Sequence, residues 1–84
     1  MDATAAWIKR RLTAGNFRLS IHAGERGNLR LVTEADIRHC GRTAMSIQFQ
    51  DPRGTWRVIG LDCDGEKLNV ICAVHEHLLI VTLF

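Results

Sequence analysis

Three side chains between residues 20 and 30 have the types and spacing that RNA cleavage needs. His22, Arg26 and Arg30 follow one another at four-residue intervals, so on a helix they form one row with neighbouring Cβ atoms about 5–6 Å apart. An imidazole can remove the 2′-hydroxyl proton of RNA, and fixed guanidinium groups can meet the charge that grows on the phosphate. The row therefore predicts a phosphodiester-cleaving site with His22 as the general base and the two arginines on the phosphate.

A structural role explains the same row without any chemistry. A histidine followed by arginines on a short helix is often a solvated face, with Glu25 or Asp36 as ion-pair partners. Spacing alone favours this interpretation, because a pattern of two residue types recurs by accident. Both interpretations stay open from these residues.

Further polar candidates lie near the end of the chain. Thr82 interrupts the apolar segment 78–84, where its hydroxyl either satisfies a backbone group or reaches a site beside helix 21–30. His75 and His77, two apart at a strand end, would point the same way and could chelate a metal. No cysteine or carboxylate completes the ligand set, so we favour a polar turn and expect no metal or cofactor.

The elements that must position these residues follow from the hydrophobic period. Helices are expected over residues 3–13, over 21–30 with Ser20 as N-cap, and from a capping-box start at Thr33 to Gly41. After Gly41 the period changes to that of strands, which are expected over residues 45–50, 55–63, 67–74 and 78–84. Turn residues separate the strands at 51–54 and at Asp64-Gly65.

The order of these elements predicts the fold class. Helices followed by an antiparallel meander indicate one α+β domain over residues 1–84, with N-terminal helices and a four-stranded, mainly antiparallel sheet. The last two strands are apolar on both faces, so they should be central or covered on both sides.

Length and composition exclude several classes of protein. A chain of 84 residues with 46% hydrophobic and 24% charged residues fits one small globular domain. Three cysteines without a close pair make neither a disulfide framework nor a zinc ribbon, and are expected as reduced, mostly buried thiols. No apolar run approaches the ~20 residues that span a bilayer. Asp2 and the basic run 9–11 argue against a signal peptide, so we expect a cytoplasmic protein.

Charge is unevenly distributed along the chain. Residues 1–57 carry a net charge of +5 and residues 58–84 a net charge of −3, and nine of the eleven basic residues are arginine. The planar fork of arginine suits phosphate, which permits nucleic-acid binding, although arginine also serves protein interfaces. The candidate contacts to an RNA backbone are Arg10, Arg11, Arg18 and Arg57.

Two signatures resemble a known family. Ser20-x-His22-Ala23-x-Glu25-Arg26, then Arg30 and Val32-Thr33-x-x-Asp36-Ile37, is similar to the pattern of the family catalogued as domain of unknown function 4258. The ending, from Gly65-Glu-Lys-Leu68-x-Val70 to Leu79-Ile80-Val81-Thr82-Leu83-Phe84, is similar to the closing hairpin of that family. The resemblance covers nearly the whole chain.

The resemblance implies a RelE/ParE-like toxin fold and a role in a bacterial toxin–antitoxin system. In related nucleases of this fold, a helix histidine, basic residues and a hydroxyl from a late strand line the site. The matching positions are His22, Arg26, Arg30 and Thr82. The implied partners are a small antitoxin, of zinc-ribbon type beside some members, and RNA, either free or on the ribosome.

The leading hypothesis is therefore a toxin-like, metal-independent endoribonuclease that acts on mRNA. The alternative is a non-catalytic binding module, or an orphan RelE-like domain, that docks a partner protein through its basic helical face. A homodimer formed through the edge of the hairpin is a third interpretation.

Overall fold

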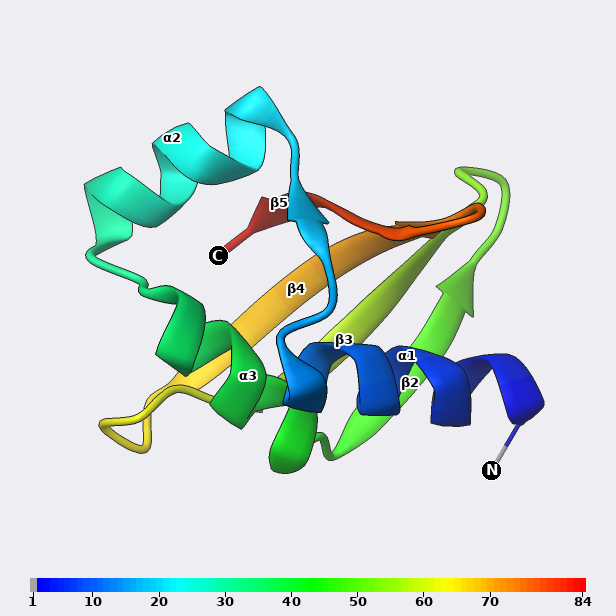
Figure 1. Ribbon diagram of the computed structural model, residues 1–84, viewed down its shortest axis with the longest axis horizontal. Helices are drawn as coiled ribbons and strands as arrows, with labels where there is room; N and C mark the ends of the chain where they lie inside the picture. The colour runs from blue at the N-terminus through cyan, green and yellow to red at the C-terminus, as the bar shows by residue number, and fades with distance from the viewer. Residues whose placement is uncertain (1) are drawn as a thin grey trace.

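The computed structural model describes residues 2–84 and has an α+β architecture (Figure 1). The helices are α1 (Ala3–Ala14), α2 (Ile21–Arg30) and α3 (Glu34–Arg42). The strands are β1 (Arg18–Leu19), β2 (Ser46–Gln50), β3 (Thr55–Leu61), β4 (Lys67–Val74) and β5 (Leu78–Leu83). The α+β class is confirmed, and each expected helix and strand is present with its ends shifted by at most two residues.

The sheet has five strands rather than the four expected. Its order is β1-β5-β4-β3-β2, in which β2 to β5 form the expected antiparallel meander. The added strand, β1, pairs parallel to β5 through Arg18–Leu79 and Leu19–Ile80. A two-residue strand is too short to show an alternating pattern in the sequence. It is a strand only because it pairs with β5. As expected, β4 is central.

A single hydrophobic core lies between the helices and one face of the sheet. Figure 1 shows α1 in front of the strands and α2 beside β5. Val58, Val70, Cys72 and Ile80 alternate along the strands on this face and are fully buried. The helices contribute fully or almost fully buried side chains to the same cluster: Ile8, Leu12, Ala23, Ile37 and Cys40. Trp7 and Trp56 are partly buried and pack against this cluster.

Two glycines allow the helical layer to approach closely. A Cβ at Gly41 on α3 would collide with the Leu12 side chain on α1, and a Cβ at Gly60 on β3 would collide with the Cys40 carbonyl. Because neither position has space for a methyl group, α1, α3 and the sheet pack backbone against backbone at these points.

A bulge in β5 changes which side chains face the core. Cys72 pairs with Ile80 and Ile71 pairs with Thr82, so Val81 is an extra residue without a partner on β4. Because of this insertion, Thr82 lies on the face opposite the core, whereas Leu83 is fully buried.

The helices of the described chain are short. Among residues 2–84, none is long and apolar enough to cross a membrane.

Candidate functional site

The first turn of α2 is fixed on β5 through Ser20. The Ser20 hydroxyl accepts a hydrogen bond from the Ala23 amide (3.0 Å) as the predicted N-cap, and donates one to the Val81 carbonyl (2.7 Å). The Ser20 amide also donates to the Ile80 carbonyl (2.9 Å). The chain segment that carries His22 therefore starts directly beside the bulge that precedes Thr82.

The predicted row is present on α2. Ala23 and Gly27 are buried toward the core. The row of His22, Arg26 and Arg30 is next to them, where the surface of α2 meets solvent. His22 and Arg30 are exposed, and Arg26 is half-buried. Gly27 and Asn28 do not interrupt the helix, which continues to Arg30 and ends at Leu31 in the left-handed conformation.

Asp36 is not an ion-pair partner of this row. One carboxylate oxygen accepts hydrogen bonds from the Thr33 amide (2.8 Å) and hydroxyl (2.9 Å), and the other accepts one from the Cys63 amide (2.9 Å). These donors lower the pKa of the Asp36 carboxyl to about 2, with the Thr33 amide as the largest cause. The role of Asp36 is to hold α3 to the turn between β3 and β4.

Thr82 and Arg57 lie on the same face of the sheet. Thr82 on β5 pairs with Ile71 on β4, and Ile71 pairs with Arg57 on β3. Directly paired residues share a face, so the three side chains form a line across the three strands. The helices pack on the opposite face, so we call this the uncovered face. Thr82, Ile71 and Arg57 are half-buried there.

Arg57 is tightly held on the uncovered face. Its Nε and Nη2 atoms both donate to Asn69 Oδ1, at 3.0 and 2.8 Å. Its Cζ atom lies 5.5 Å from the centre of the Phe84 ring. Asn69 and Phe84 pair through their backbones in both directions, at 2.8 and 3.0 Å. Asn69 and Phe84 were not predicted as site residues, because no pattern in the sequence indicates that they contact Arg57.

The structure separates the four predicted RNA-contacting arginines. Arg18 pairs with Leu79, on the uncovered face with Thr82 and Arg57. Arg10 and Arg11 are instead on α1 in the helical layer, where the Arg11 guanidinium lies 4.7 Å from the centre of the Trp7 ring. A single straight strand of RNA cannot contact both pairs.

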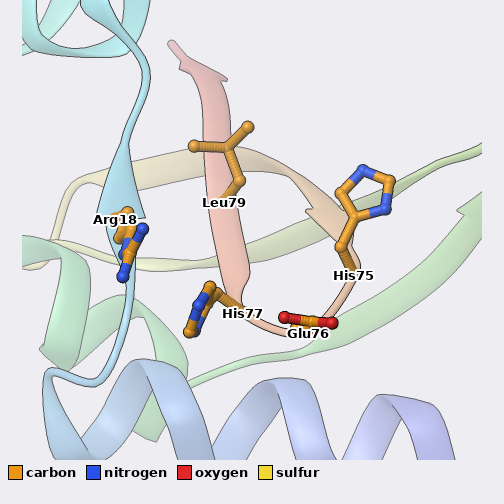
Figure 2. A pocket seen from close by; sticks show the side chains of 5 residues that line it. All are labelled: Arg18, His75, Glu76, His77 and Leu79. Atoms are coloured by element: carbon orange, nitrogen blue, oxygen red, sulfur yellow. The ribbon is translucent and has the colours of Figure 1, made fainter.

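A hollow of about 450 Å³ lies at the edge where β1 meets the turn between β4 and β5 (Figure 2). Arg18, His75, Glu76, His77 and Leu79 line it. Figure 2 shows His77 on the same side as Arg18 and His75 on the other side of Leu79. The two imidazoles thus do not point the same way, contrary to the sequence expectation. The hollow itself could not be predicted, because it depends on β1.

The described residues offer no cluster for a metal ion. Within residues 2–84, no three histidine, cysteine or acidic side chains gather so that they could hold one. Cys40 and Cys72 are buried free thiols, as expected, and burial raises their pKa to about 11 and about 12. Cys63 is exposed, because it lies in the turn between β3 and β4.

Known proteins supply no direct guide to this site. No family model matches the chain, and no curated protein and no solved structure matches it either.

Proposed function

We propose that this protein is a toxin-like, metal-independent endoribonuclease that acts on mRNA in the cytoplasm, with a RelE/ParE-like fold. The observation that carries the proposal is the attachment of α2 to β5 through Ser20, at 2.7 Å from the Val81 carbonyl. It fixes the first turn of α2, which carries His22, to β5 one residue before Thr82, whose own side chain lies on the uncovered face. The resemblance of the two sequence signatures to the family of unknown function 4258 supports the same class.

The proposed reaction is a transfer within the RNA backbone. His22 takes the proton of a 2′-hydroxyl, the 2′-oxygen forms a bond to phosphorus, and the bond from phosphorus to the 5′-oxygen breaks. Arg26 and Arg30 bind the non-bridging oxygens, on which negative charge increases. Thr82 positions the phosphate or relays a proton from water to the leaving 5′-oxygen. The products are a 2′,3′-cyclic phosphate and a 5′-hydroxyl end, and no step requires a metal.

The test replaces the general base without changing the fold. We expect His22→Gln to cut a single-stranded RNA at least about 100-fold more slowly than wild type in the presence of a chelator, because general-base catalysis contributes that much. RNA affinity and the circular dichroism spectrum should stay unchanged. His39→Gln, which removes a histidine from α3, is the matched control and should cut at the wild-type rate.

Growth after induced expression gives a second measurement. Arrest with loss of RNA in wild type, and neither effect in His22→Gln at equal protein level, supports the nuclease. Equal cleavage rates for wild type and His22→Gln contradict it.

A second candidate function is supported by apolar residues at the outer side of α2. Ile21, Leu29 and Leu31 are 84%, 79% and 85% exposed, beside the basic row. Such a surface fits docking of a partner protein, such as a small antitoxin, by a module without catalytic activity. Growth arrest by both wild type and His22→Gln, with RNA intact, would favour this alternative.

A further inference from the structure

The guanidinium of Arg57 is held in place, but only some of its N–H groups donate to other groups of the protein. A guanidinium has five N–H groups, and two of them point to Asn69 Oδ1. Asn69 is only 7% exposed, and its amide nitrogen donates to the Phe84 carbonyl at 3.3 Å. Asn69 therefore holds the plane of the guanidinium, while the remaining N–H groups of the half-buried arginine are free to bind a ligand above the sheet.

An aromatic ring lies beside this cation. Phe84 is on the uncovered face, with its ring centre 5.5 Å from the Arg57 Cζ atom, and 37% of the residue is exposed. A fixed guanidinium over one side of a partly exposed ring is a combination that can bind a phosphate and an adjacent base in single-stranded nucleic acids.

The strands place charge of one sign on the uncovered face, and one acidic side chain, Glu76 of the turn between β4 and β5, lines the hollow with Arg18. The charged residues that the strands place there are Arg18, Arg57 and Lys67, and all are basic. The acidic residues of the C-terminal half lie instead in the turns: Asp51, Asp62, Asp64, Glu66 and Glu76. Gln48, which pairs with Arg57, adds an uncharged hydrogen-bonding side chain. This distribution is complementary to a polyanion, and a second copy of the same basic face would be repelled.

The distance between the two arginines of this face sets the length of the ligand. Arg57 is on β3 and Arg18 is on β1, which are three strand spacings apart, roughly 14 Å across the sheet. Arg18 lies with His77 on one side of the hollow (Figure 2). A single mononucleotide is too short to reach both arginines, whereas an extended strand of several nucleotides can.

We propose that the uncovered face of the sheet binds single-stranded RNA, with Arg57 on a phosphate, Phe84 stacked on a base, and Arg18 with His77 on a second phosphate. The choice of RNA rests on the proposed function. The surface itself rests on the contacts of Arg57, Asn69 and Phe84, which the nuclease proposal does not use.

The experiment measures binding alone. Fluorescence anisotropy follows a short labelled RNA with 2′-O-methyl riboses, which cannot be cleaved, at several salt concentrations. We expect Arg57→Gln to weaken binding about tenfold and to reduce the slope of log affinity against log salt by about one. Arg42→Gln, at the end of α3, removes the same charge from the helical layer and should change affinity less than about twofold.

A second variant guards against a folding defect. Arg57→Gln leaves buried Asn69 without its donors, so the variant is first compared with wild type by circular dichroism. Phe84→Leu keeps the Arg57–Asn69 pair and removes only the ring, and it should weaken binding about fivefold or more through lost stacking.

Two results would overturn the inference. The first is wild-type affinity and salt slope for both Arg57→Gln and Phe84→Leu. The second is a stable dimer in sedimentation that RNA does not displace and that Phe84→Leu dissociates, since a second copy would then cover this face. Because the RNA cannot be cut, failure of His22 as a catalyst does not affect this outcome, and loss of the sheet surface does not affect the role of His22.

Discussion

Single polar residues hold the elements of this small domain together. The Thr33–Asp36 capping box was predictable, because both partners are three residues apart and their spacing is a known helix start. The third contact of Asp36, to the Cys63 amide 27 residues away, was not, because nothing local encodes it. The same holds for Ser20, whose role as N-cap was predicted and whose hydrogen bond to Val81 was not.

Asp36 gives a prediction of acid sensitivity. Its folded pKa of about 2 is below the ordinary 3.8, so its stabilisation is complete above pH 3.8 and is lost as the pH falls toward 2. Asp36→Asn should lower the free energy of unfolding by about 1–3 kcal/mol at neutral pH, because the amide NH2 of asparagine would face one of the N–H or O–H donors that the carboxylate accepts from. The difference in the free energy of unfolding between wild type and Asp36→Asn should shrink as the pH falls from 3.8 toward 2.

Urea unfolding followed by circular dichroism measures this difference. Asp64→Asn is the control, because Asp64 is an exposed carboxyl in the turn between β3 and β4. Its free energy of unfolding should stay close to that of wild type at every pH. A deficit for Asp36→Asn that is constant down to pH 2 would contradict the linkage to ionisation.

At the scale of elements, the bulge at Val81 explains why the face of Thr82 was not predictable. Simple alternation along β5 would place Thr82 on the core face with Leu78 and Ile80. The extra residue reverses this order and moves Thr82 to the uncovered face. Long elements with caps or alternating patterns were predicted well, whereas β1 and the bulge depend on pairing between strands.

The contact between α1 and α3 gives a prediction about packing. Gly41→Ala would place a methyl group against the Leu12 side chain and should destabilise the domain by about 1–3 kcal/mol through overpacking. Gly24→Ala is the matched control in α2, because nothing lies within 4 Å of its Cβ position. It should stabilise the domain by about 0.5–1 kcal/mol through helix propensity.

Thermal and urea unfolding of both variants test this packing. A Gly41→Ala variant that is as stable as wild type would mean that α1 and α3 can separate without loss. That result would leave the close approach of the two helices unnecessary for the fold.

For the whole molecule, the layered arrangement divides its surfaces by role. The helices cover one face of the sheet and build the core, and the other face gathers Arg18, Arg57 and Thr82. The sequence shows that these residues are polar or basic among apolar neighbours. It cannot show that they share a face, because that depends on the register of four strands.

Two buried thiols report whether this molecule unfolds as one unit. Cys40 on α3 and Cys72 on β4 are both fully buried in the same core cluster, and burial raises the pKa of each. Only Cys63 should react with iodoacetamide in the native state, and slowly, because its hydrogen bond to the Asp36 carboxylate raises the pKa of its thiol. With increasing urea, Cys40 and Cys72 should become reactive at the same concentration, since one core joins the helices to the sheet.

Mass spectrometry of the adducts measures this: one adduct before the transition and three after it. A variant-free control is the circular dichroism transition, which should coincide with it. If Cys40 reacts at lower urea than Cys72, α3 opens before the sheet unfolds, and the two layers are separate units of stability.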